Sequence, residues 1–112
     1  MQRWIAMPDN IKKLLTELKK GLTRLYGEQL KAVYLYGSYA RGDYNTGSDV
    51  DVMIVLDEYK NYWDEIARTS ELMQTISLEY ELTLSRIFIT QEKWENADTP
   101  LLHNIRRDAQ PA

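Results

Sequence analysis

The sequence predicts a single α+β (or α/β) domain, in which a small mixed β-sheet is flanked by helices. Three observations lead to this prediction. The chain has 112 residues, 44% hydrophobic and 28% charged, which is the size and composition of one globular domain. Segments with helical spacing of apolar residues alternate with segments rich in branched and aromatic residues. Turn-forming stretches separate them, so helices can cover at least one face of the sheet. Residues 1–112 are therefore treated as one domain.

The first half of the chain predicts a helix, a strand, a short helix and a loop. Residues 9–26 carry leucines and isoleucine at i, i+3, i+4 and i+7, which is typical of an amphipathic helix with a lysine-rich outer face. Residues 30–36, LKAVYLY, are rich in branched and aromatic side chains and predict a strand. Residues 37–42, GSYARG, follow as a turn and a short helix, and residues 43–48, DYNTGS, as a loop.

The second half repeats this alternation. Residues 49–56, DVDVMIVL, are apolar on both faces after their first turn, which predicts a central strand. Residues 60–80 predict a long helix that packs on the sheet through a stripe beginning at Trp63. Residues 82–90, LTLSRIFIT, alternate as a third strand. A last helix is expected over about residues 99–107, with a proline at its first position.

Charge and composition exclude several classes of protein. The net charge of −3 argues against direct nucleic-acid binding, which requires a basic surface. The absence of cysteine excludes disulfides, zinc-thiolate sites and a thiol nucleophile. The N-terminus lacks the pattern of a signal peptide, and no stretch approaches the ~20 apolar residues of a membrane span. We expect a soluble, cytoplasmic protein with no membrane partner, whose last residues, 106–112, are frayed.

Two aspartates stand at the start of the predicted central strand. Side chains alternate along a strand, so Asp49 and Asp51 point the same way, roughly 6.5–7 Å apart. Carboxylates this close either share a proton or bind a cation. Oxygen ligands without a nearby histidine or cysteine favour Mg²⁺ or Mn²⁺. A bare D-x-D pair can also be a solvated strand entrance or part of a helix cap, and that alternative stays open on these residues alone.

A phosphate-binding turn is predicted twelve residues before the first aspartate. Gly37 ends a strand and allows close approach of the backbone, while a helix that begins there directs free N–H groups outward. Ser38 adds a hydroxyl donor, and Arg41 lies one helical turn further on. If the two strands are neighbours, this turn and the two carboxylates lie at the same end of the sheet.

The spacing of these residues, G-S-x10-D-x-D, resembles the nucleotidyltransferase superfamily that includes DNA polymerase β. More narrowly, GSYARG followed by SDVDVMIV is similar to the minimal nucleotidyltransferases of bacteria and archaea. The resemblance implies a polymerase β-like core that binds ATP or another NTP with two Mg²⁺ (or Mn²⁺) ions, transfers the nucleoside monophosphate and releases pyrophosphate. It implies that Gly37 and Ser38 hold the β- and γ-phosphates. Asp49 and Asp51 would be the catalytic metal ligands. Arg41 would neutralise triphosphate charge, although a salt bridge on the helix surface is equally consistent with its position.

The sequence departs from this family at one point. Members use a third carboxylate on a later strand, but residues 82–90 contain no acid. The expected position is occupied by Ser85 or Ile87, and Glu81 is a weak candidate because it shares strand parity with Ser85. Without a third acid, the acceptor hydroxyl lacks its nearest base, so transfer would be slow, lost or dependent on a partner.

The resemblance also implies a partner. Minimal members pair with a small helical HEPN-domain toxin, which they neutralise by binding and by AMP transfer to a toxin tyrosine. The leading hypothesis is an antitoxin that adenylylates such a toxin. The alternative is a catalytically weak or inactive module that blocks a HEPN partner sterically. A third option is a small-molecule nucleotidyltransferase that works as a homo-oligomer. Tyr39 and Tyr44 flank the site and would either pack or stack on a base.

Overall fold

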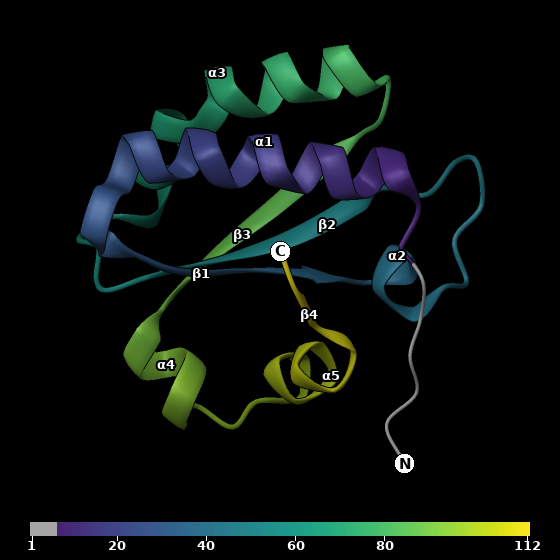
Figure 1. Cartoon of the computed structure of the whole chain (residues 1–112). Helices are drawn as coiled ribbons and strands as arrows, with labels where there is room; N and C mark the ends of the chain where they lie inside the picture. The colour runs from purple at the N-terminus through teal and green to yellow at the C-terminus, as the bar shows by residue number, and fades with distance from the viewer. Residues whose placement is uncertain (1–6) are drawn as a thin grey trace.

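The structure is a computed structural model that describes residues 7–112. It contains a mixed sheet with helices on both faces (Figure 1). In chain order the elements are α1 (Asp9–Tyr26), η1 (Gly27–Gln29), β1 (Leu30–Tyr36), α2 (Ser38–Arg41), β2 (Val50–Leu56), α3 (Tyr62–Tyr80), β3 (Leu84–Thr90), α4 (Gln91–Asn96), α5 (Pro100–Asp108) and β4 (Gln110–Pro111). Three strands and the helices predicted from periodicity are confirmed.

The sheet has the order β3-β2-β1-β4, so β2 lies in its centre. Strand β2 is antiparallel to β1 and parallel to β3, while β4 adds to the outer edge of β1 in the antiparallel sense. Every residue of β2 except Asp51 is buried. This confirms the predicted mixed sheet and explains why β2 is apolar on both faces.

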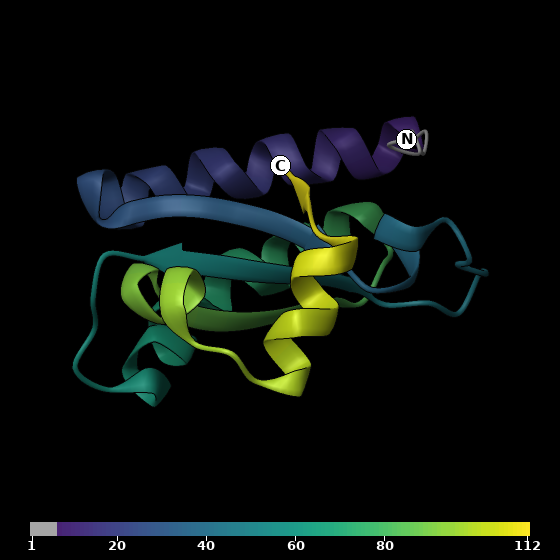
Figure 2. The same ribbon diagram turned by 90° about the horizontal axis from the view of Figure 1, so that it is seen from below.

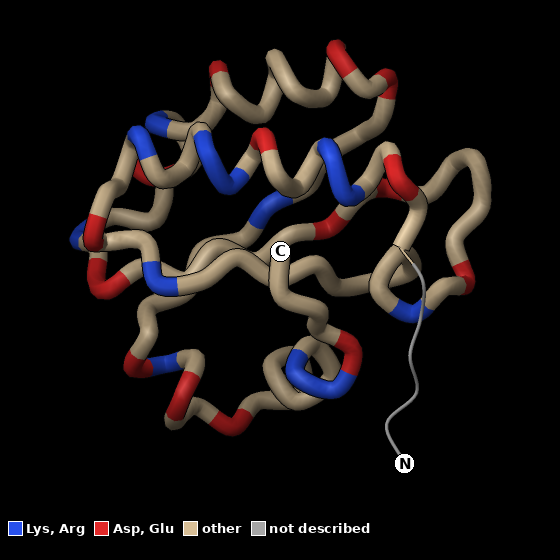
Figure 3. Tube along the Cα trace, in the orientation of Figure 1, with Lys and Arg blue, Asp and Glu red and all other residues tan. Residues whose placement is uncertain are grey.

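Helices α1 and α3 cover one face of the sheet, and α4 and α5 cover the other (Figures 1 and 2). The larger core lies under α1 and α3, where the apolar stripe of α1 meets Val52, Ile54 and Leu56 of β2. The smaller core joins the opposite side of β2, through Met53 and Val55, to α5. Because side chains alternate along β2, successive residues of this strand pack into the two cores on opposite faces of the sheet. The lysine-rich face of α1 is exposed, and Figure 3 shows basic residues at several of its turns.

The buried stripe of helix α3 matches the predicted one only in part: Met73 and Ile76 are buried as expected. Trp63 is 72% exposed, whereas Glu65 and Thr69 are buried. Glu65 is tolerated because its Oε1 accepts hydrogen bonds from Tyr26 Oη (2.8 Å) and Arg68 Nε (3.1 Å). The prediction was wrong at the Trp63 end of the stripe, because hydrophobic periodicity does not identify polar residues that are buried with partners.

The C-terminal residues are ordered rather than frayed. Backbone pairing joins Gln110 and Pro111 of β4 to β1, and the N–H of Ala112 donates to the carbonyl of Val33 (2.9 Å). A two-residue strand that contains proline has no sequence pattern of its own, so only its long-range pairing reveals it. Helix α4 was also not predicted, because one and a half turns are too short to show helical periodicity.

Across residues 7–112, no helix is both long enough and apolar enough to cross a membrane.

Candidate functional site

Strand register brings the predicted carboxylates to one end of the sheet. Asp51 is paired with Tyr36 of β1 on one side and with Ser85 of β3 on the other. It lies on the same sheet face as Met53 and Val55, which is the face covered by α4 and α5. Asp49 precedes β2 by one residue and is exposed, whereas Asp51 is half-buried. Of the two carboxylates, Asp51 therefore lies deeper in the candidate site and Asp49 lies nearer the solvent.

The glycine turn lies in contact with this carboxylate. Gly37 has φ 77° and ψ −156°, a conformation that is essentially confined to glycine. A Cβ added to Gly37 would collide with Oδ2 of Asp51. The predicted adjacency of the turn and the carboxylates is therefore direct, because the backbone of Gly37 and the side chain of Asp51 occupy neighbouring space.

Helix α2 consists of a single turn that begins immediately after Gly37. The N–H groups of Ala40 and Arg41 donate to the carbonyl of Gly37 (3.1 and 3.0 Å). The N–H groups of Ser38 and Tyr39 precede these bonds and have no partner within the helix. At the other end Gly42 adopts a left-handed conformation and its N–H donates to the carbonyl of Ser38 (2.8 Å). The turn that follows Gly37 therefore carries two backbone N–H groups without a partner in the helix, together with the hydroxyl of Ser38.

Arg41 is held by two carboxylates in the free protein. Its Nε pairs with Asp43 Oδ2 at 3.2 Å, and its Nη1 pairs with Asp108 Oδ2 at 3.5 Å. The Arg41 side chain is 43% exposed. The salt-bridge alternative considered for this residue is therefore present, and it involves an acid from α5 that sequence spacing did not single out.

The electrostatics of the site favour a cation. Burial raises the pKa of Asp51 above its ordinary value, repulsion from Asp49 raises it further, and Arg41 opposes the shift. Burial and the charge of Asp51 also raise the pKa of Tyr36 to about 12. The single guanidinium therefore does not fully offset the two neighbouring aspartates.

The donor set fits a magnesium ion that brings most of its own ligands. Among residues 7–112, no group of three or more aspartate, glutamate or histidine side chains is arranged to hold a metal. Magnesium is commonly bound by one or two protein carboxylates and completes its shell with water and substrate phosphates. Asp49 and Asp51 meet that requirement, provided that a nucleotide held at the neighbouring turn supplies the phosphates.

The pairing of β2 with β3 shows which residue stands where the third carboxylate of the family is expected. Ser85 is the register partner of Asp51, whereas Ile87 is opposite Met53 and too far along the strand. Glu81 is exposed and ends α3 in a left-handed conformation (φ 54°), before β3 begins. Glu81 was a candidate only if it continued the alternation of β3, but it belongs to the end of α3 instead. Glu81 therefore does not join Asp49 and Asp51.

Two tyrosines stack beside the site. The rings of Tyr39 and Tyr44 lie 4.4 Å apart between centroids and 15° from parallel. Tyr39 is buried, whereas Tyr44 is 40% exposed. The loop that carries Tyr44 is closed by Asn45, whose side chain accepts from the N–H of Gly47 (2.8 Å). The pair thus orders the connection between α2 and Asp49 by packing.

The comparison of sequences identifies related proteins. A family profile described as "Nucleotidyltransferase domain" matches residues 15–106. Two relatives from Methanocaldococcus jannaschii are both described as candidate protein adenylyltransferases. One is 36% identical over 74 residues, covering 66% of this chain and 74% of the relative. The other is 32% identical over 83 residues, covering 74% and 77%.

Solved structures share the fold at low sequence identity. A candidate minimal nucleotidyltransferase superimposes with a TM-score of 0.67 at 15% identity, covering 96% of this chain and 97% of that one. A toxin–antitoxin structure with AMP-PNP gives 0.58 at 19% identity, with 92% and 69% covered. A tri-AMPylated HEPN toxin in complex with its MNT antitoxin, from Shewanella oneidensis, gives 0.51 at 16% identity, with 88% and 70% covered.

Proposed function

Because this chain belongs to the nucleotidyltransferase domain family, we propose that it transfers AMP from ATP to a protein hydroxyl in a Mg²⁺-dependent reaction. The observation that carries the proposal is the contact between the Gly37 turn and Asp51. This contact supports the proposal because it brings the turn proposed to bind phosphate next to one of the two carboxylates proposed to bind the metal. A nucleoside triphosphate with its metal needs both, and neither half alone distinguishes such a site from an ordinary surface turn.

The roles of the residues follow from this arrangement. The N–H groups of Ser38 and Tyr39 and the hydroxyl of Ser38 bind the β- and γ-phosphates. Asp49 and Asp51 would hold the metal, which would supply positive charge to stabilise the attacking and leaving oxygens. Arg41 offsets the charge of the triphosphate. The acceptor oxygen forms a bond to the α-phosphorus as the bond from that phosphorus to the pyrophosphate oxygen breaks. Pyrophosphate leaves, and the proton of the acceptor hydroxyl passes to solvent water.

The acceptor that we propose is a tyrosine of a HEPN-domain toxin, which makes this chain the antitoxin of a pair. The support comes from the relatives, which are described as candidate protein adenylyltransferases, and from structural neighbours in toxin–antitoxin complexes. The AMPylated toxin among them shows that this fold occurs beside a protein that carries AMP.

A second candidate function is steric neutralisation of the same partner with little or no transfer. The observation that favours it is Ser85, which occupies the place beside Asp51 where the family's third carboxylate is expected. A serine hydroxyl is a weak metal ligand and a poor base, so the catalytic step lacks one of its usual contributors.

The proposed function is tested by incubating the chain with its helical partner, Mg²⁺ and α-labelled ATP. We expect label on the partner, none when γ-labelled ATP replaces it, and none in excess EDTA. The γ-label control separates adenylyl transfer from phosphoryl transfer. A tight complex that takes up no α-label under any of these conditions would leave steric neutralisation as the function.

Replacing Ser85 tests whether the missing acid limits the reaction. Ser85→Asp should accelerate transfer about tenfold or more, because it places a base and metal ligand directly beside Asp51. Ser85→Asn is the matched control, since it has the same shape without the charge and should give no gain. The measurement is the initial rate of α-label transfer at several Mg²⁺ concentrations. A rate equal to that of Ser85→Asn would show that a carboxylate at this position is not what limits transfer.

A further inference from the structure

Helix α2 depends on a distant segment for its position. It has only four residues, and a single helical turn is not stable alone. At its C-terminal end the carbonyl of Ala40 accepts a hydrogen bond from Gln110 Nε2 at 2.7 Å. The next residue, Arg41, pairs with Asp108. Residues 108–112, the C-terminal segment, therefore contact α2 at two successive positions.

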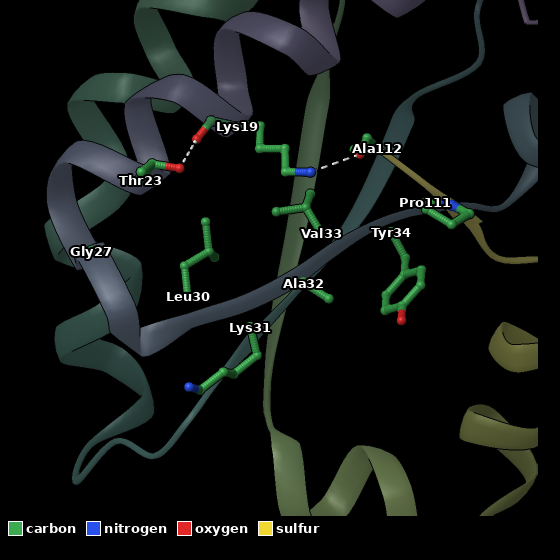
Figure 4. A pocket seen from close by; sticks show the side chains of 10 residues that line it. All are labelled: Lys19, Thr23, Gly27, Leu30, Lys31, Ala32, Val33, Tyr34, Pro111 and Ala112. Atoms are coloured by element: carbon green, nitrogen blue, oxygen red, sulfur yellow. Dashed lines mark hydrogen bonds between the residues drawn. The ribbon is translucent and has the colours of Figure 1, made fainter.

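The C-terminal segment is itself fixed to the strand that leads into the site. Gln110 pairs with Leu35 in register, and the N–H of Ala112 donates to the carbonyl of Val33. Figure 4 shows the side chain of Lys19 in α1 reaching the carbonyl oxygen of Ala112, at 3.1 Å. Strand β1 continues directly into Gly37 and α2. The C-terminal segment therefore contacts both the strand before Gly37 and the helix after it.

The two carboxylates that hold Arg41 differ in what they contribute. Asp43 is 63% exposed and only two residues away in sequence, which makes its pair with Arg41 weak. The Asp108 side chain is 15% exposed and belongs to α5, so its pair is less screened and fixes Arg41 relative to another part of the fold. Asp108 also contacts Arg107 Nε at 3.4 Å, which balances its charge.

This arrangement leaves part of the guanidinium for a ligand. Nε and Nη1 are engaged with the two acids, and Nη2 takes part in neither pair. A free arginine side chain loses up to ~2 kcal/mol of rotamer entropy when a ligand immobilises it. A side chain that is already held avoids most of that cost on binding.

We propose that Asp108 and Gln110 are positioning residues for the triphosphate, acting through Arg41 and α2. Asp108 orients the Arg41 guanidinium, and Gln110 holds the C-terminal end of the helix whose first N–H groups bind phosphate. The inference rests on the proposed nucleotide-binding function, but it concerns binding alone and does not require that transfer be fast.

The test is the affinity of the full chain for Mg-ATP, measured by isothermal titration calorimetry. Asp108→Asn should weaken binding about 3–10-fold, and Asp108→Glu should recover at least half of that loss. In the Arg41→Gln background, Asp108→Asn should have no further effect, because the loss passes through Arg41. Asp98 is an exposed acid two residues before α5, so Asp98→Asn is the matched control and should bind like the unmodified chain.

Gln110→Ala provides a second measurement that does not depend on the charge of residue 108. Hydrogen exchange at residues 40–42, whose N–H groups form the bonds of α2, should accelerate, while exchange in β2 stays unchanged. Binding by Asp108→Asn that equals or exceeds that of the unmodified chain would overturn the inference, as would an undiminished loss in the Arg41→Gln background. If the unmodified chain does not bind Mg-ATP, the proposed function fails together with the inference. If it binds and Asp108→Asn binds equally well, the inference alone fails, so the two failures are distinguishable.

Discussion

Gly37→Ala is expected to abolish nucleotide binding and to destabilise the fold. The backbone conformation at this position is strained for any residue with a Cβ, at a cost of about 1–3 kcal/mol. The added methyl group also meets Oδ2 of Asp51, so either the turn or the carboxylate must move. We expect the free energy of unfolding to fall by about 2 kcal/mol or more in urea titrations. We expect Mg-ATP affinity to fall at least ~100-fold, because the donors and the metal ligands no longer align.

Two comparisons separate the causes of this effect. Gly47→Ala in the adjacent loop is the matched control, because its Cβ would meet nothing closer than 3.5 Å and its φ is not positive. It should change stability by less than ~0.5 kcal/mol. In an Asp51→Ala background, Gly37→Ala should cost less than in the unmodified chain, since only the backbone strain remains. Nucleotide affinity of Gly37→Ala within threefold of the unmodified chain would contradict the predicted contact.

Asp51→Asn is expected to eliminate transfer while stabilising the free protein. The loss should reach about 10³-fold or more in the rate of α-label transfer, because the proposed metal ligand loses its negative charge. The gain in stability follows from the raised pKa of Asp51, which burial and Asp49 produce. The folded protein binds this proton more tightly than the unfolded chain, so the ionised carboxylate destabilises the fold at neutral pH.

The pH dependence of this gain has a definite sign. The destabilisation is fully present above the folded-state pKa of Asp51 and disappears as the pH falls below the ordinary value of about 3.9. Asp51→Asn should therefore melt at a higher temperature than the unmodified chain at pH 7 in EDTA, and at the same temperature near pH 3. Asp57 lies just beyond the opposite end of β2, and Asp57→Asn is the matched control. Its melting temperature should not rise above that of the unmodified chain at pH 7. If Asp51→Asn and the unmodified chain melted at equal temperatures at every pH, the predicted destabilisation by the ionised Asp51 carboxylate would be contradicted.

Local patterns predicted the parts of the site that are close in sequence. The strand ending at Gly37, the one-turn helix and the strand carrying Asp51 are each visible from residue types, and antiparallel pairing of neighbouring strands brings them together. The choice between Ser85 and Ile87 required the register of β2 against β3, which alternation alone does not determine.

The contacts of Asp108 and Gln110 with α2 cannot be predicted from the sequence for a different reason. They connect residues about seventy positions apart through individual side chains, and no periodicity marks such a pair. Buried Glu65 illustrates the same limit within the core. Its partner Tyr26 comes from another helix, so the residue looks like a surface glutamate in the sequence.

The antiparallel pairing of β1 and β2 has a consequence for how the protein reaches its structure. These strands are joined by residues 37–49, a connection that also carries most of the candidate site. Closing a loop of this length costs less chain entropy than the crossover through α3 that the parallel β2–β3 pair requires. We therefore expect the β1–β2 hairpin to form early, so that the Gly37 turn and Asp51 meet before the C-terminal segment docks against α2 and β1.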